Sequence, residues 1–414
     1  SMLKGTIKLD GDKSLSHRIL IFGALSNSKS TIYNLSKSDD VKRTINILKN
    51  CNFKIKTNEK FTTVYKSNIN QKIKKFYCGN SGTTARFMIG FLPSIGISGT
   101  LYGDKSLSKR PMKRLLDSLL KMNVKIKTNK ETLPIQFEKS NINPINFTLN
   151  HPSAQIKSAL IFAALSSKET SIIKDPFKTR NHTENIIKFL GGTTEGYKKF
   201  SFKGFNYTIP GDISSASFII AAALLVKGSN IKIKNVLFNE TRTGFIKVLQ
   251  RMGANIQLSN IRIECFEKVA DINVQYSTNL KSVALKKSDI LNMIDEIPIF
   301  ALIACFAKGE TRVNHAAELR YKESDRIKSI VFNLQKCGAK ITEMKEGFII
   351  NKSKLLYNTS IKSFQDHRIA MMCEILYLVI QGGINHNKHK IIDTSFPDFY
   401  KHLGSLYEWF LCNR

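Results

Sequence analysis

The stretch GDKSLSHRILIFGAL, residues 11–25, decides how this chain is expected to fold. From Ile19 onward it is apolar on every side, which is typical of a helix enclosed by other elements. Its first turn nevertheless carries Lys13, Ser14 and Arg18, although the helix macrodipole favours acidic side chains at that end. Cations and a helix N-terminus together favour an anion, so we expect an anion site here. Without the anion, this end is expected to be strained or mobile.

The same plan recurs six times along the chain. A polar start runs into an apolar helix, near residues 12, 79, 152, 211, 294 and 366, about 59 to 83 residues apart. Between these segments lie amphipathic helices followed by a β-prone run, as in VKRTINILKNCNFKIK (residues 41–56). Their apolar residues recur with the helical period. The repeat is therefore predicted to be a buried helix, a strand, a surface helix and a strand, with the last copy truncated.

Six repeats indicate an α/β fold of two similar domains with three repeats each. The division is expected near TIPGD, residues 208–212. We predict an N-terminal domain over 12–208 and a C-terminal domain over 209–414. A short strand within residues 1–11 could pair in either half, and we group it with the C-terminal domain.

Composition narrows the class of protein. The 414 residues are 42% apolar and include 64 Lys and Arg against 32 Asp and Glu, a net charge of +32. Such a charge is compatible with nucleic-acid binding, but lysines are scattered throughout, as AT-rich coding sequence would produce, and we favour that explanation. A third possibility is that part of the charge collects anionic small molecules in a cleft.

Cysteine and histidine patterns point away from metals and disulfides. The seven cysteines show no C-x-x-C spacing and the eight histidines show no metal-ligand spacing, so we expect no metal. The sequence also has no G-x-x-x-x-G-K-[ST] phosphate loop and no dinucleotide-binding fingerprint, and we expect no cofactor. No apolar run reaches the roughly 18 residues that cross a bilayer. We expect a cytoplasmic protein.

Candidate binding residues gather at the predicted helix starts, where free backbone N–H groups bind anions. Those of the first half are Lys13, Ser14, Arg18, Asn80, Ser81, Gly82, Thr83, Arg86, Ser153, Gln155 and Lys157. Any single Ser or Thr among them could simply cap its helix. Arg110, before a proline that can occupy the first helical turn, suits a bidentate grip on a carboxylate or phosphate.

The second half supplies acidic and basic residues in close order. They are Asp295, Glu296, Lys322, Glu323, Asp325, Arg326, Asp366, His367 and Arg368. Asp325 and Asp366 are expected to be helix caps, while the remaining charges fit an acid/base site that faces bound anions. The residues together predict a cleft between two similar domains, with cations from both, for two anionic small molecules.

These segments resemble the 5-enolpyruvylshikimate-3-phosphate synthases of the enolpyruvyltransferase family. The matching motifs, in the family's order, are GDKSLSHR, GNSGTTARFM, GDKSLSKRPM, SAQIKSALIFAAL, PGDISSASF, DEIP, FAKGET, ELRYKESDRI, DHRIAM and TSFPDF. The resemblance implies transfer of the enolpyruvyl group of phosphoenolpyruvate to the 5-hydroxyl of shikimate 3-phosphate, as a 3-phosphoshikimate 1-carboxyvinyltransferase of the shikimate pathway. It also implies six β-α-β-α-β-β units in two domains, each an inside-out α/β barrel, that close around the ligands.

The resemblance also implies a role for each matching residue. Shikimate 3-phosphate would contact Lys13, Ser14, Arg18, Ser153, Ala154, Gln155, Arg180, Asp295 and Lys322. Phosphoenolpyruvate would contact Lys13, Asn80, Gly82, Arg110, Gln155, Arg326 and Arg368. Asp295 would take the 5-hydroxyl proton, and Glu323, with Lys13, would handle protons at the methylene carbon. The partners would be these two substrates, with no nucleic acid and no membrane, and the protein would be a monomer.

Two positions depart from the family pattern. Many relatives place a lysine shortly before the [ST]-[FY]-P motif, where this chain has Asp393 and Thr394, and Lys390 is a weak substitute. Ala154 stands where other members have a second serine. Gly82 keeps the small residue associated in the family with glyphosate binding, so inhibition by glyphosate is expected.

The nearest alternative is the sister enzyme that acts on UDP-N-acetylglucosamine. That enzyme has Asn after its first Lys and usually a reactive Cys in a mobile loop. This chain has Ser14 after Lys13, and no cysteine between Cys78 and Cys265, where the loop would fall. The shikimate 3-phosphate enzyme is therefore favoured.

Overall fold

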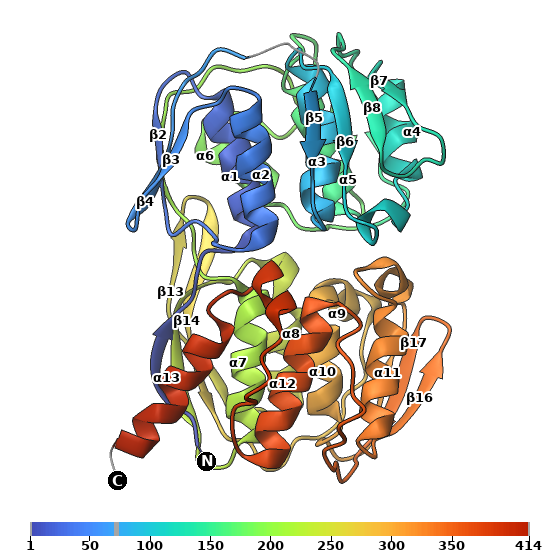
Figure 1. Ribbon diagram of the computed structural model, residues 1–414. Helices are drawn as coiled ribbons and strands as arrows, with labels where there is room; N and C mark the ends of the chain where they lie inside the picture. The colour runs from blue at the N-terminus through green and yellow to red at the C-terminus, as the bar shows by residue number, and fades with distance from the viewer. Residues whose placement is uncertain (1, 70–73, 413–414) are drawn as a thin grey trace. The chain divides into compact units, whose positions relative to one another are not determined.

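The computed structural model describes residues 2–69 and 74–412. The chain divides into two compact units, residues 11–209 and residues 1–10 with 210–414. We call them the N-terminal unit and the C-terminal unit, and each is described by itself (Figure 1).

The N-terminal unit alternates helices and short strands. Its helices are α1 (Lys13–Leu25), α2 (Asp39–Asn50), α3 (Gly82–Ser94), α4 (Lys113–Lys121), α5 (Ala154–Ala164) and α6 (His182–Phe189), with the 3-10 turn η1 (Leu107–Lys109). Its strands are β2 (Ser30–Tyr33), β3 (Ile55–Thr57), β4 (Phe61–Val64), β5 (Lys74–Tyr77), β6 (Gly99–Tyr102), β7 (Lys125–Lys127), β8 (Ile135–Glu138), β9 (Asn146–Thr148), β10 (Ile172–Lys174) and β11 (Asn206–Thr208).

The C-terminal unit repeats the same alternation. Its helices are α7 (Ile213–Leu225), α8 (Gly244–Arg251), α9 (Lys287–Leu291), α10 (Ile297–Ala304), α11 (Arg326–Lys336), α12 (His367–Gln381) and α13 (Phe399–Cys412), with the 3-10 turns η2 (Glu240–Arg242), η3 (Ile294–Glu296), η4 (Ala317–Tyr321) and η5 (Lys390–Thr394). Its strands are β1 (Lys4–Lys8), β12 (Asn230–Leu237), β13 (Ile256–Glu264), β14 (Glu267–Gln275), β15 (Glu310–Val313), β16 (Lys340–Met344) and β17 (Gly347–Asn351).

The sheets follow one topology. In the four-stranded sheets, the strand after a buried helix pairs in parallel with one strand on one side and antiparallel with a hairpin on the other. The four-stranded orders are β11-β2-β4-β3, β5-β6-β8-β7 and β1-β12-β14-β13. The third copy keeps only the parallel pair β9 and β10, and the fifth only β15-β17-β16. After α12 the sixth copy continues with η5 and α13 and has no strand among the described residues.

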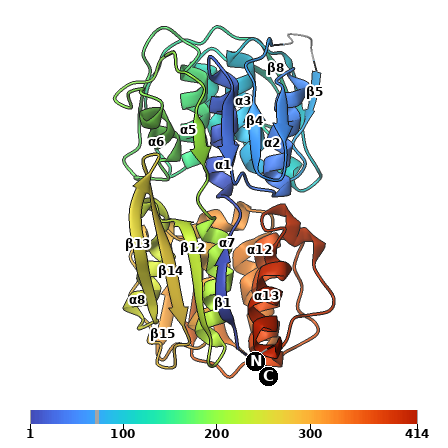
Figure 2. The ribbon, with the colours of Figure 1, turned by 90° about the vertical axis from the view of Figure 1, so that its left-hand side faces the viewer.

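The N-terminal strand belongs to the C-terminal unit. β1 pairs in parallel with β12, with Lys4 opposite Asn230 and Lys8 opposite Lys234 (Figure 2). This pairing joins segments more than two hundred residues apart, and it completes the sheet of the fourth repeat.

The apolar helices form the cores, as the repeat pattern predicts. In the N-terminal unit, the ring of Phe162 on α5 packs edge-on against Phe22 of α1 at 5.8 Å and Phe87 of α3 at 5.3 Å between centroids. A methyl group at Gly90 of α3 would lie 2.4 Å from the carbonyl oxygen of Ala159, so these two helices meet at backbone contact. In the C-terminal unit, the apolar helices α7, α10 and α12 also pack against one another in one core.

Among the described residues, no helix is long and apolar enough to cross a membrane.

Candidate active site

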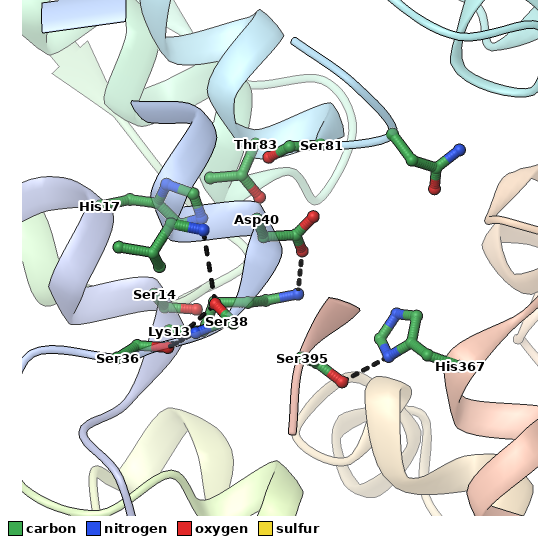
Figure 3. A network of polar contacts seen from close by, with 12 residues as sticks. Lys13, Ser14, His17, Ser36, Ser38, Asp40, Ser81, Thr83, His367 and Ser395 are labelled. Carbon is green, nitrogen blue, oxygen red and sulfur yellow. Dashed lines mark hydrogen bonds and ion pairs between the residues drawn. The ribbon is translucent and has the colours of Figure 1, made fainter. Parts of the chain in front are cut away.

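The first buried helix begins with a cation that already has an acidic partner. Asp12 caps α1, because its carboxylate accepts the Leu15 N–H at 2.9 Å. Lys13 Nζ donates to Asp40 Oδ2 at 2.5 Å (Figure 3). Asp40 is the second residue of α2 and is buried. Two carboxylates that the sequence analysis did not assign, Asp12 and Asp40, therefore offset the cations at this helix start.

Two arginines lie beside the same helix start. Arg18 is 2% exposed, and its guanidinium donates to Thr183 Oγ1 at 2.8 Å and Ser158 Oγ at 3.1 Å, and to the Ser14 carbonyl at 2.9 Å. Arg180 donates to Ser14 Oγ at 3.3 Å. The first and third repeats thus place two guanidinium groups around one serine.

The start of α5 is joined to the start of α3. Ser153 caps α5 by accepting the Ile156 N–H at 3.2 Å, and Ala154 is the first helical residue. The Gln155 amide donates to Thr83 Oγ1 at 2.9 Å. Three of the predicted binding segments, from the first three repeats, therefore converge within the N-terminal unit.

Asn80 and Arg110 form a separate contact at the start of α3. Arg110 Nη2 donates to Asn80 Oδ1 at 2.8 Å, and Asn80 Nδ2 lies 3.0 Å from both carboxylate oxygens of Asp104. Gly82 is the first residue of α3. A methyl group there would lie 2.6 Å from Arg86 Nη1 and 3.0 Å from Arg110 Nη1, so the small residue leaves room for both guanidinium groups.

Two expectations for this unit are wrong. Lys157 does not belong to an open anion cradle: it is 3% exposed, and its Nζ lies 2.8 Å from Asp175 and 2.9 Å from Glu184. It stands a turn into α5, where its side chain is buried between charged partners. Pro111 precedes α4 by two residues rather than occupying its first turn, since that helix begins at Lys113.

A buried hydroxyl network connects α1, α2 and α3. His17 Nδ1 contacts Thr44 Oγ1 at 2.7 Å, Thr44 contacts Thr84 at 2.9 Å, and Thr84 contacts Ser81 at 2.7 Å. Burial, the dominant cause, lowers the pKa of His17 to about 3, so its ring is neutral. His17 and Thr44 belong to the first repeat, and Thr84 and Ser81 belong to the second, so no periodicity or motif spacing predicted that these side chains would meet.

Arg326 is the centre of the charged cluster in the C-terminal unit. It is 2% exposed, and its guanidinium lies 2.6 Å from Glu323, 2.8 Å from Asp366 and 3.7 Å from Asp295. Burial by itself would lower the pKa of Arg326, but the carboxylates of Asp366 and Glu323 outweigh it and raise that pKa. Both carboxylates with an expected acid/base role are thus held by one permanent cation.

The helix caps of this unit are as predicted. Asp325 caps α11 by accepting the Lys328 N–H at 3.1 Å, and Asp366 caps α12 by accepting the Arg368 N–H at 3.0 Å. Arg368 is buried at the second position of α12. Lys322 Nζ donates to Glu318 at 3.0 Å.

One group in the described part of the chain has metal-ligand geometry, Glu323 with Asp366 and His367. The guanidinium of Arg326 contacts both of its carboxylates and supplies the positive charge that a metal ion would bring. We therefore assign no metal to this group.

The segment where relatives carry a lysine is arranged differently here. Thr394 is buried at the end of η5, and Lys390 is exposed at its beginning. The next residue, Ser395, contacts His367 Nδ1 at 2.5 Å (Figure 3). This segment therefore contacts His367 through a hydroxyl group.

Comparisons with known proteins identify the family. The family model described as EPSP synthase (3-phosphoshikimate 1-carboxyvinyltransferase) matches residues 1–403. The chain belongs to the EPSP synthase family.

Relatives and solved structures agree with this assignment. A 3-phosphoshikimate 1-carboxyvinyltransferase from Oceanobacillus iheyensis is 39% identical, with 98% of this chain and 97% of the relative covered. One from Thermotoga neapolitana is 37% identical, with 96% of each covered. The EPSP synthase structure from Acinetobacter baumannii superposes with a TM-score of 0.84 at 31% identity, covering 98% of this chain and 96% of that one.

A more distant structure supports the architecture only. The enolpyruvyl transferase NikO from Streptomyces tendae has a TM-score of 0.75 at 14% identity, over 98% of this chain and 95% of that one. The EPSP synthase family and its two-domain α/β fold of buried helices, both predicted from motifs and repeats, are therefore confirmed.

Proposed function

We propose that the chain catalyses the reaction after which its relatives are named, transfer of the carboxyvinyl group of phosphoenolpyruvate to shikimate 3-phosphate. The products are 5-enolpyruvylshikimate 3-phosphate and inorganic phosphate, in the biosynthesis of aromatic amino acids. The observation that carries the chemistry is the cluster in which Asp295 and Glu323 share the buried guanidinium of Arg326. Addition and elimination both require proton transfers, and carboxylates held in fixed positions can accept and return protons.

The shikimate 3-phosphate site is assigned to the first and third repeats of the N-terminal unit. A phosphate is doubly charged near neutral pH and binds best where cations and helix N-termini meet. Lys13, Ser14, Arg18 and Arg180 supply cations and hydroxyls at the start of α1. Additional contacts are assigned to Ser153, Ala154 and Gln155 at the start of α5, and to Asp295 and Lys322 of the C-terminal unit.

The phosphoenolpyruvate site is assigned to a second set of cations. Arg110 is held by Asn80 beside the start of α3. Gly82 has no side chain at the first position of this helix, which lets an anion approach the helix N-terminus closely. Lys13, Gln155, Arg326 and Arg368 complete the assigned set. Asp40 holds the ammonium group of Lys13, so a bound anion would share this group with Asp40.

The proposed reaction proceeds in two steps. In the addition step, Asp295 accepts the 5-hydroxyl proton, the oxygen bonds to C2 of phosphoenolpyruvate, and the methylene carbon gains a proton from Glu323, assisted by Lys13. In the elimination step, the C2–O bond to phosphate breaks, the departing phosphate takes up the proton held by Asp295, and the methyl group returns a proton to Glu323, so both carboxylates recover their starting protonation states. Every atom of the two substrates is then found in the two products.

Phosphate release on mixing purified protein with phosphoenolpyruvate and shikimate 3-phosphate tests the proposal. Lys13→Met and Glu323→Ala are expected to lower the rate at least a hundredfold, in line with lost electrostatic and acid–base catalysis. Lys42→Met and Glu310→Ala are matched controls, because both side chains are mostly exposed. Release of phosphate only when UDP-N-acetylglucosamine replaces shikimate 3-phosphate would refute the assignment.

A further inference from the structure

We propose that Asp104 is a positioning residue for phosphoenolpyruvate: it orients the Asn80 amide so that the amide oxygen faces Arg110. This inference rests on the proposed function, which assigns Asn80 and Arg110 to that substrate. Asp104 lies in the turn between β6 and η1 and is half-buried.

The hydrogen-bonding chemistry allows one amide orientation. Asn80 Nδ2 lies 3.0 Å from Oδ1 and 3.0 Å from Oδ2 of Asp104, while Asn80 Oδ1 lies 2.8 Å from Arg110 Nη2. A carboxylate only accepts hydrogen bonds and a guanidinium only donates them. If the amide rotated by half a turn, its NH₂ group would face the guanidinium and its oxygen would face the carboxylate. Asp104 therefore selects the rotamer that holds Arg110.

Asp104 is itself held firmly by the backbone. Its N–H donates to the Gly79 carbonyl at 2.8 Å, its Oδ1 accepts the Leu107 N–H at 2.8 Å, and its carbonyl accepts the Ser108 N–H at 3.0 Å. The turn that Asp104 begins leads directly into η1, and Arg110 follows that turn. One residue thus anchors the Asn80 amide and starts the turn that delivers Arg110.

The negative charge of Asp104 indicates that this residue orients the Asn80 amide and does not itself attract the substrate. A carboxylate close to an anion site opposes anion binding by Coulomb repulsion. An asparagine at position 104 would avoid that repulsion and could still cap the turn. It could not fix the Asn80 amide, because it presents both a donor and an acceptor. Fixing the geometry of a binding group in advance lowers the ordering cost of binding.

Two substitutions separate the orienting role from the capping role. Asp104→Asn and Asp104→Ser both keep an acceptor for the Leu107 N–H, but both lose the charge that orients Asn80. We expect each to raise KM for phosphoenolpyruvate about tenfold, the scale of a hydrogen bond to a charged group, with KM for shikimate 3-phosphate changed less than twofold. Asp104→Glu retains the charge and should recover part of the loss.

A double-mutant cycle tests whether Asp104 acts through Asn80. In an Asn80→Ala background there is no amide to orient, so Asp104→Asn should raise KM for phosphoenolpyruvate by less than twofold more. An additive tenfold effect in that background, or an equal rise in KM for both substrates, would overturn the inference. Failure of the wild-type protein to release phosphate would instead overturn the proposed function. If the wild-type protein is active and Asp104→Asn leaves KM for phosphoenolpyruvate unchanged, only this inference is overturned.

Discussion

Replacing Lys157 by methionine should destabilise the N-terminal unit severely. The ammonium group lies 2.8 Å from Asp175 Oδ2 and 2.9 Å from Glu184 Oε2, and the three side chains are 3%, 9% and 15% exposed. Methionine matches the length and apolar stem of lysine but removes the charge. Two carboxylates would then remain together with little access to water.

The expected loss follows from this geometry. Removing one partner of a buried ion pair typically costs about 3 to 5 kcal/mol, because the remaining charge is left uncompensated. Asp175 keeps the hydrogen bonds from the backbone N–H groups of Phe177 and Thr179, which places the cost near the lower end, about 3 kcal/mol. With a urea slope of about 2 to 3 kcal/mol/M, the unfolding midpoint should fall by about 1 M.

The assay is urea unfolding followed by circular dichroism, with hydrogen exchange of peptides from α5 and α6 to localise the loss. Lys113→Met is the matched control. Lys113 also contacts two carboxylates, Asp117 at 3.3 Å and Glu131 at 3.1 Å, but all three side chains are at least half exposed. Solvent screens that cluster, so its removal should leave the midpoint unchanged.

The pH dependence provides a second check on the same reasoning. Burial by itself raises the pKa of Asp175, but hydrogen bonds from Lys157 and Thr179 outweigh it and lower that pKa overall. The wild-type stabilisation is therefore present above the unfolded pKa of about 4 and is lost as the pH falls below it. Without Lys157, the pKa values of Asp175 and Glu184 should rise. The two carboxylates should then become protonated as the pH falls, so the variant should recover stability on acidification. Equal midpoints for the Lys157 and Lys113 variants, or a gap that widens towards pH 5, would refute the argument.

Three further predictions concern single side chains. Gly82→Ala should raise KM for phosphoenolpyruvate several-fold and leave KM for shikimate 3-phosphate nearly unchanged, because the methyl group would lie 3.0 Å from Arg110 Nη1; equal changes in steady-state kinetics would contradict this. Burial raises the pKa of Glu374 to about 7. Stability should therefore fall as the pH rises from about 4.5 to 7, and Glu374→Gln should be more stable than wild type by about 3 kcal/mol at pH 8 in thermal unfolding. Asp366→Asn should cost about 3 kcal/mol in the same assay, since it leaves the buried Arg326 with one fewer carboxylate; a smaller loss than for an exposed aspartate would count against that role.

The repeats, the fold and the family could be predicted because their signals are local. A helix that is apolar on all sides, such as the one that starts at Lys13, must be enclosed whatever its neighbours are. The caps Asp325 and Asp366 were also predictable, because a cap bonds a backbone N–H within three residues of itself. The same local rule wrongly placed Lys157 at an open helix start, since the rule does not tell which face of α5 is buried.

The partners of the charged groups were decided only by the tertiary structure. Asp40 lies 27 positions from Lys13, Asp104 lies 24 from Asn80, and Asp366 lies 40 from Arg326. Each pair comes from different elements, and neither spacing nor composition states which elements meet. The sequence by itself determined that cations and carboxylates would gather at the starts of the repeated helices. The packing of the helices decides which of these charged groups are paired within the protein and which are held in place by a neighbour. Ion pairs and hydrogen bonds require contact distances, and only packing sets those distances.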